Sequence, residues 1–481
     1  MTPGPRFASI RRALIAVCCI AALVAILANA GGSAQAADAL IGPDVTVFQL
    51  SGTQSYGSSG GFVGYSIGTT SCNRGDTPLN WCNSGSGCAP GATSEDHPVI
   101  AQNLYRLKNG RFEQIGMSWL KHGFVSTNST TGGCAGSSGQ SCVSPPAGGR
   151  QLGIGCTDPY GSSLNGNRPL GRRSEVNATS GLFPFPPGGG GSTATVYDQR
   201  VKVATADVDS ALNPGALYFA EAQYIANDDA GSGNALNNAS HRRVTVGAGP
   251  SFNLSLTGTF FEMQPAIFSW PLQDPTVSLV KVDVPGSIVE RFHVARKVTD
   301  LGGGLWHYEY AVHNLNSDRS ARGFTVEFPA TANFTNVGFK DIEHHSGEPY
   351  ATTDWTVFSS GGEISWSTDT FASNPNANAL RWSTMFNFWF DADQPPTGGI
   401  VHTLDLFKPG DPSSLDFTIV GELFMDGFES GNTVNWSGIT SSRPIDQTSL
   451  GPVINPGGAS WLDGQARSSV VHRTWSRLGS R

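Results

Sequence analysis

The sequence predicts an all-β protein, in which antiparallel β-sandwich domains accompany a loop-rich, disulfide-stapled N-terminal region. Its 481 residues include 60 glycines and 29 prolines, and only 14% of them are charged. This composition disfavours long helices, which are rich in alanine, leucine and charged residues. Apolar and polar residues alternate along several runs, as they do in antiparallel sheets with one face in water. Six cysteines fall within one window, at positions 72–156.

Residues 1–36 have the organisation of a secretory signal peptide. A basic start with three arginines precedes the apolar stretch 13–27, and the Ala-Gln-Ala sequence at 34–36 offers a cleavage site. An uncleaved anchor is the alternative, but the apolar stretch is shorter than the roughly 20 residues that span a bilayer. No later stretch is long and apolar enough to cross a membrane. We therefore expect a secreted protein, either extracellular, associated with the cell surface or periplasmic.

The charge of the chain bears on its partners. Cleavage after residue 36 would remove three arginines and no acid, leaving 27 basic and 38 acidic residues and a net charge of −11. A strongly acidic chain is repelled by phosphate backbones and anionic lipids. Nucleic acid and anionic membranes are therefore not expected as partners.

The cysteines predict a disulfide framework. An even number of cysteines in an exported chain is typical of disulfides, although six cysteines allow 15 pairings. A zinc site is the alternative, but no C-x-x-C spacing occurs after the signal segment. The six residues are Cys72, Cys82, Cys88, Cys134, Cys142 and Cys156.

Period-two alternation and turn residues divide the rest of the chain. Turn-forming pairs and triplets of Asn and Gly at 109–110, 302–304 and 361–362 separate the runs. Apolar faces of strands are expected at Phe252, Leu254 and Leu256; at Phe324, Val326 and Phe328; at Trp382, Phe386, Phe388 and Phe390; and at Leu415, Phe417 and Ile419. The predicted parts are a signal peptide (1–36), a cysteine-stapled β-rich region (37–286), a β-sandwich-like domain (287–422) and a C-terminal segment with a disordered tail (423–481).

Histidines provide the candidate metal ligands. His344 and His345 are followed by Glu348 and Tyr350, and His122 follows a strand-like run and precedes a glycine. Three imidazoles with a carboxylate would suit zinc or copper. The alternative is that these histidines are structural, with their hydrogen bonds satisfied within the fold.

Two further groups of residues have a functional and a structural interpretation. His307, Glu309 and His313 would share one face of a strand, either as ligands or as a solvated face above an aromatic core. Asp228 and Asp229 could supply oxygen ligands to calcium, although a solvated turn is the simpler interpretation because the spacing matches no known calcium loop.

Five tryptophans lie in the second predicted β domain, at positions 306, 355, 366, 382 and 389. Exposed aromatic faces on a sandwich can stack on sugar rings, whereas alternation with other apolar residues indicates a core role. We expect most of these side chains to be buried.

Several segments resemble known bacterial sequences. GMSWLKHGF (116–124), YEYAVHNLNSDRS (308–320) and HHSGEPYATTDW (344–355) resemble segments of a family of large secreted β-rich proteins from environmental bacteria, for which no activity is established. LFMDGFESGNTVNWS (423–437) is similar to a short C-terminal segment of exported proteobacterial proteins. The resemblance implies an exported bacterial product and carries no catalytic residue to this chain.

Two functions are compatible with these features. The first is binding of a cell surface or an extracellular polymer such as a polysaccharide. The second is a metal-dependent enzyme, oxidative or hydrolytic, that uses the histidine cluster with copper or zinc. No catalytic motif decides whether the protein is an enzyme.

Overall fold

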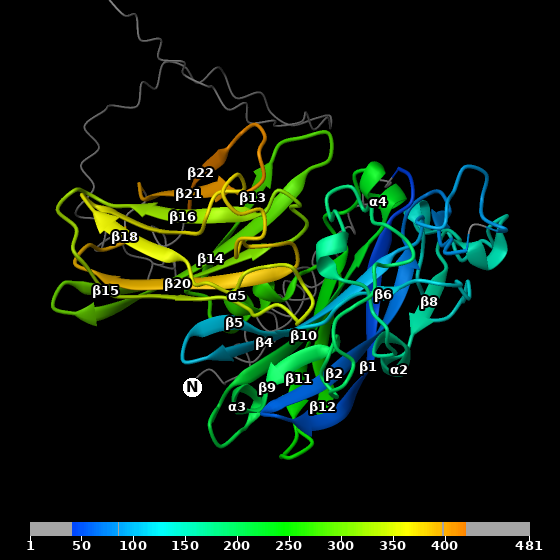
Figure 1. The fold of residues 1–481 in the computed structure, drawn as a ribbon, viewed down its shortest axis with the longest axis horizontal. Helices are drawn as coiled ribbons and strands as arrows, with labels where there is room; N and C mark the ends of the chain where they lie inside the picture. Colours follow the sequence, from blue (N-terminus) through cyan, green and yellow to red (C-terminus); the bar gives the residue numbers. More distant parts are fainter. Residues whose placement is uncertain (1–40, 85, 397–398, 420–481) are drawn as a thin grey trace, which may run out of the picture. The chain divides into compact units, whose positions relative to one another are not determined.

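The computed structural model describes residues 41–84, 86–396 and 399–419. These residues form mainly antiparallel strands with short helices between them, so the predicted all-β class is confirmed (Figure 1). The predicted signal peptide and the C-terminal segment from residue 423 lie outside the described residues. Within the described part, no helix is long and apolar enough to span a membrane.

The first sheet is built from residues 45–261. Its main path is β1 (Val45–Ser59), β2 (Phe62–Asn73), β9 (Val201–Ala204), β5 (Arg111–Met117), β4 (Val99–Lys108), β10 (Leu217–Ile225), β11 (Ala239–Val246) and β12 (Leu254–Phe261). β6 (Lys121–His122) pairs with β4, and β8 (Thr157–Tyr160) pairs with β2. β1 and β12, the two ends of this path, lie close together: the Thr53 hydroxyl of β1 donates to the Leu254 carbonyl of β12 (2.6 Å). The Tyr65 hydroxyl of β2 donates to the Phe252 carbonyl, just before β12 (2.7 Å).

Two five-stranded sheets form a sandwich over residues 278–418. One has the order β13 (Ser278–Val284), β14 (Glu290–Gly302), β15 (Leu305–Asn314), β20 (Thr384–Ala392) and β17 (Phe334–Lys340). The other has the order β18 (Thr356–Ser360), β19 (Glu363–Ser367), β16 (Ala321–Glu327), β21 (Val401–Leu406) and β22 (Ser414–Thr418). Their facing side chains form one aromatic core, which includes Tyr308, Tyr310, Phe324, Trp366, Phe386, Phe388 and Phe390.

The remaining elements are short. A small two-stranded sheet pairs β3 (Leu79–Asn80) with β7 (Gln151–Leu152). The α-helical turns are α2 (Ser162–Asn165), α3 (Thr205–Val208), α4 (Asn227–Gly231) and α5 (Ser269–Gln273). The 3₁₀ turns are η1 (Ser137–Gly139), η2 (Gly148–Arg150), η3 (Arg173–Glu175) and η4 (Ala266–Phe268).

The β4–β5 hairpin shows how local sequence determines a turn. Asn109 and Gly110 have φ angles of 52° and 84°, and the flanking Lys108 and Arg111 are paired. Two consecutive residues with positive φ match the twist of a tight hairpin, and Asn-Gly is the favoured pair for it. The predicted turn is therefore confirmed.

The predicted apolar face at Trp382 to Phe390 is wrong for one residue, Trp382. Phe386, Phe388 and Phe390 face the sandwich core as expected, but Trp382 packs in a separate cluster with Leu120 and Phe183. The reason is local: Ser383 has a φ angle of 56°, which interrupts the extended backbone and turns the preceding residue away.

The first sheet and the sandwich share a buried apolar cluster. Phe112 and Phe219 from the first sheet pack with Ala295, Ala311 and Met385 from the sandwich. Backbone groups also join the two, since the Met385 amide donates to Gln114 Oε1 (2.8 Å).

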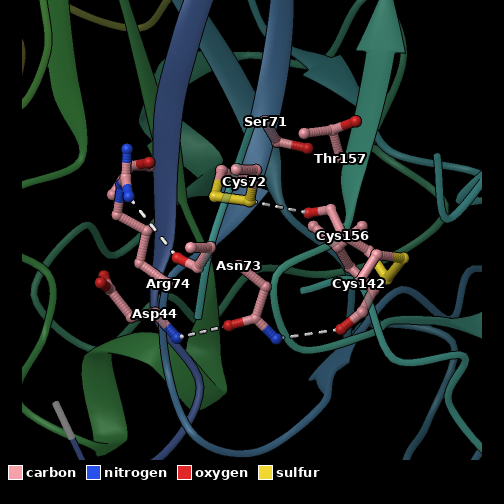
Figure 2. Close-up of a disulfide and its surroundings, with 12 residues drawn as sticks. Asp44, Ser71, Cys72, Asn73, Arg74, Cys142, Cys156 and Thr157 are labelled. Carbon is pink, nitrogen blue, oxygen red and sulfur yellow. Dashed lines mark hydrogen bonds between the residues drawn. A yellow bond between two sulfur atoms is a disulfide. The ribbon is translucent and has the colours of Figure 1, made fainter. Parts of the chain in front are cut away.

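All six predicted cysteines are paired in disulfides. The pairs are Cys72–Cys134, Cys82–Cys88 and Cys142–Cys156, with sequence separations of 62, 6 and 14 residues. In Figure 2, Asn73 lies next to Cys72, and its side chain accepts a hydrogen bond from the Asp44 amide (3.2 Å). The longest bridge therefore joins the end of β2 to the loops of residues 123–156.

Candidate functional site

His122 pairs with another histidine. His97 Nε2 lies 2.9 Å from His122 Nδ1, and His97 Nδ1 lies 3.0 Å from the Cys82 carbonyl oxygen. A carbonyl only accepts, so the neutral His97 ring donates from Nδ1 and accepts from His122 Nδ1. Burial lowers the pKa of His97 to about 4 and that of His122 to about 3, which keeps both rings neutral at pH 7.

The other predicted ligands have separate surroundings. His345 Nε2 lies 2.8 Å from the Met117 carbonyl oxygen. Glu348 accepts hydrogen bonds from the amides of Arg173 (2.8 Å) and Ser174 (3.2 Å), and so caps the turn η3. His344 is 9% exposed, and its ring centroid lies 4.9 Å from that of Tyr350. Neither ring nitrogen of His344 has a hydrogen-bond partner among the described residues.

No group of three His, Cys, Asp or Glu side chains in the described part of the chain is placed to hold a metal ion. The ring of His122 packs against His97, Phe183 and Phe185. The ring of His344 packs instead against Tyr350, and that of His345 contacts the Met117 carbonyl. The predicted ligand set of His122, His344, His345 and Glu348 stays a prediction.

The strand β15 has the predicted faces, but its polar face is buried. Tyr308, Tyr310 and Val312 face the sandwich core, whereas Glu309 and His313 are only 4% and 1% exposed on the opposite side. The expectation of a solvated face is wrong, because the first sheet covers it. Arg111 of that sheet binds Glu309 through two contacts of 2.8 Å.

His307 lies at the edge of this face between two carboxylates. Its Nε2 is 3.5 Å from Glu309 Oε2, and its Nδ1 is 2.6 Å from Asp391 Oδ1. The hydrogen bond to Glu309 is the largest cause that raises the pKa of His307, and the bond to Asp391 adds to it. The folded protein therefore binds a proton here more tightly than the unfolded chain does.

This arrangement predicts a pH-dependent contribution to stability. Because the pKa of His307 is raised on folding, the contribution is fully present below about pH 6.5, the ordinary histidine value, and is lost as the pH rises through the folded pKa. We expect His307→Gln to lower the melting temperature at pH 6 and to have a smaller effect at pH 8.5. Thermal melts of both proteins across this range measure the difference. An equal loss at both pH values would contradict the prediction.

The five tryptophans of the second predicted β domain are buried or partly buried. Trp355, Trp366 and Trp382 are 3%, 0% and 4% exposed, while Trp306 and Trp389 are partly buried. The guanidinium carbon of Arg111 lies 3.7 Å from the centroid of the Trp389 ring, which it covers. Most of these side chains are therefore part of the packing, as expected.

An open cleft lies where the first sheet meets the segment that follows β17. Its volume is about 380 Å³, within the range of ligand-binding clefts. Strands β2, β5 and β9 and the turn α3 contribute one side, and residues 340–343 contribute the other. The lining residues are Phe62, Gln114, Ile115, Lys202, Ala204, Asp207, Lys340, Asp341, Ile342 and Glu343.

One side of the cleft combines an aromatic ring with a cation. Lys202 Nζ lies 4.2 Å from the centroid of the Phe62 ring and 4.0 Å from Glu343 Oε2. The ring of Tyr197 packs against Phe62 with 5.3 Å between centroids. Since the Glu343 side chain is 72% exposed, its contact with Lys202 costs little to rearrange around a ligand.

An ion-pair network fixes the other side. Lys340 Nζ contacts the Glu113 carboxylate, which also accepts a 2.6 Å contact from Arg106. Arg106 reaches Asp207 Oδ1 at 3.1 Å. Burial raises the pKa of Asp341, and Asn378 donates to its carboxylate at 2.5 Å. The cleft thus presents both signs of charge around an apolar floor of Ile115 and Ile342.

Most of this cleft could not be predicted from the sequence. Lys202 stands between Val201 and Val203 in an apolar strand, which is a weak signal for a lysine that reaches the surface. Lys340 lies four residues before the pair His344 and His345, whose imidazoles rather than this lysine attract attention in the sequence. The chain matches no known protein-family model and no curated protein.

Proposed function

We propose that the protein is an exported bacterial protein that binds an extracellular or cell-surface polymer, with a polysaccharide as the favoured ligand, through the cleft at Phe62 and Lys202. The cleft is the observation that carries this proposal. A flat aromatic ring provides an apolar surface for the face of a sugar ring. Lysine and carboxylate groups around it can donate to and accept from hydroxyl groups.

The compartment is part of the same proposal. The signal-like segment 1–36 supports export, and three disulfides are typical of proteins that fold in an oxidising environment. No pair of side chains lining the cleft has the contact between a nucleophile and a general base that acyl transfer requires. The aromatic ring of Phe62 beside the charged Lys202 supports recognition of a ligand.

Binding of the purified full-length chain to a glycan array and to insoluble cell-wall polymers tests the proposal. We expect Phe62→Ala to weaken binding about five- to tenfold, because the contact between an aromatic ring and a sugar face contributes roughly 1 kcal/mol. Phe358 is the control: it is 58% exposed, whereas Phe62 is half-buried, and it lies on the edge strand β18 and does not line the cleft. Phe358→Ala should bind as the wild type does.

Two results would overturn the proposal. One is the absence of binding to every polymer tested by folded wild-type protein. The other is binding that Phe62→Ala and Phe358→Ala reduce equally, which would place the contact outside the cleft.

A further inference from the structure

Four oxygen-bearing side chains from distant parts of the chain meet beside the start of β1. Asp44 directly precedes β1, Asp229 lies in α4, and Asn237 and Asn238 lie in the segment before β11. Asp44, Asp229 and Asn238 are all 0% exposed. The expectation that Asp228 and Asp229 form a solvated turn is therefore wrong, because the Val45 amide donates to Asp229 and the Asn80 amide donates to Asp228.

The contacts among the four side chains define one compact site. The Asn238 amide lies 2.7 Å from Asp229 Oδ2, and the Asn237 amide lies 3.3 Å from Asp44 Oδ2. Asn237 and Asn238 are consecutive residues, and Asp44 directly precedes Val45, so the two pairs are neighbours. The Val45 amide donates to Asp229 Oδ1 at 2.9 Å, which holds this carboxylate against the strand.

Several oxygens in this site have no partner. Asp44 Oδ1, Asn237 Oδ1 and Asn238 Oδ1 are buried and make no hydrogen bond within the described residues. A buried polar oxygen without a partner costs roughly 1–3 kcal/mol, so three together are unfavourable in the absence of a ligand. A half-turn of each asparagine amide about Cβ–Cγ would exchange its nitrogen and oxygen and direct the oxygen at the neighbouring carboxylate. That orientation brings amide and carboxyl oxygens together, which is the kind of ligand set that a hard cation takes.

The local charge is negative. Arg74 is the nearby basic side chain, and its guanidinium is paired with Glu262 through two contacts of 2.7 Å. The Arg74–Glu262 pair is neutral overall, so it adds no net charge beside the two carboxyl groups. Figure 2 shows Asp44 held beside Asn73 and Arg74, next to the disulfide of Cys72.

We propose that Asp44, Asp229, Asn237 and Asn238 bind one calcium ion, which ties the N-terminal strand to α4. Two carboxylates neutralise a divalent cation, and carboxylate and amide oxygens are the ligands that calcium takes, six to eight in number, at about 2.3–2.6 Å. Zinc prefers nitrogen and sulfur ligands, and neither histidine nor cysteine is part of this set. Magnesium demands near-ideal octahedral geometry and usually keeps several water molecules, whereas three of these four side chains are completely buried.

Metal analysis and calorimetry test the site. The full-length protein is purified without chelator and its calcium, zinc and copper are measured by mass spectrometry; it is then stripped with EDTA and titrated with calcium chloride. We expect about one equivalent of calcium, and at least tenfold weaker binding in Asp44→Asn and Asp229→Asn. Asp158→Asn is the control, because Asp158 is also a buried carboxyl group (1% exposed) but bonds to Thr127, outside the site.

Asn237→Asp keeps the test decisive even where the other variants fold poorly. This partly exposed position can accept a charge, and a third carboxylate should tighten calcium binding about tenfold. The proposal is overturned if stripped wild-type protein binds no calcium, which would leave an acid pair that shares a proton. It is also overturned if Asn237→Asp and Asp44→Asn bind calcium as the wild type does.

Discussion

Arg173→Met should lower the free energy of unfolding by about 3–5 kcal/mol, the largest effect that we expect of a single substitution outside the disulfides. Arg173 is 2% exposed and lies where the first sheet meets the sandwich. Its guanidinium donates to the carbonyls of Ser118 (2.6 Å), Gln102 (3.0 Å) and Ser383 (3.1 Å). It also donates to Asn103 Oδ1 at 2.9 Å. Methionine fills much of the volume but removes the guanidinium donor from the Ser118 carbonyl and Asn103 Oδ1, at roughly 1–3 kcal/mol for each oxygen that stays buried. The Gln102 carbonyl still accepts from the Ser118 amide (2.9 Å), and the Ser383 carbonyl still accepts from Asn103 Nδ2 (3.3 Å).

Urea unfolding of purified protein measures this effect, and the neighbouring arginine provides the control. The Arg172 side chain is 29% exposed and its ion pair with Glu175 spans 3.9 Å, so Arg172→Met should cost less than about 1 kcal/mol. Arg173→Lys should recover only part of the loss, because an ammonium group cannot reproduce the planar fork of five donors. Equal destabilisation by Arg172→Met and Arg173→Met would show that the hydrogen bonds of Arg173 are not the cause.

Removal of the Cys72–Cys134 bridge should destabilise the protein by about 4 kcal/mol, whereas removal of Cys82–Cys88 should cost about 2 kcal/mol. A disulfide restricts the unfolded chain, and the restriction grows with the logarithm of the loop that it closes. The separations are 62 and 6 residues. Cys72 is also completely buried at the end of β2, so its bridge fastens a core strand, while the shorter bridge closes a surface loop.

Paired alanine variants, Cys72→Ala with Cys134→Ala and Cys82→Ala with Cys88→Ala, test the difference by urea unfolding under oxidising conditions. The ranking of the two pairs is the decisive result. If the double variant at Cys82 and Cys88 loses as much stability as the double variant at Cys72 and Cys134, loop length does not control the contribution of the bridges.

Much of the fold was predictable because its signals are local. A strand with one buried face needs apolar residues at every second position, and the runs around Phe324 and Phe388 show that pattern. The turn at Asn109 and Gly110 follows from residues that tolerate positive φ angles. Trp382 shows the limit of the same reasoning, because a single residue with positive φ, Ser383, ended the alternation without any mark in the sequence.

The candidate sites were far less predictable. Lys202 and Phe62 belong to strands that are neighbours in the sheet but about 140 residues apart in the chain. Asp44 and Asp229 are separated by 185 residues, and only the packing of α4 against the start of β1 brings them together. The polar face of β15 looked solvated for the same reason, since nothing near Glu309 in sequence indicates that Arg111 covers it.

The sequence by itself therefore determined the all-β class, the main turns and the involvement of the cysteines in disulfides, because each depends on side-chain periodicity, backbone preference or redox chemistry within a short stretch. The tertiary structure alone decided which cysteines pair, which carboxylates lose contact with water and which side chains line the cleft. These outcomes depend on strand order and on the packing of the first sheet against the sandwich. Both are set by contacts between residues far apart in the chain, which leave no local pattern.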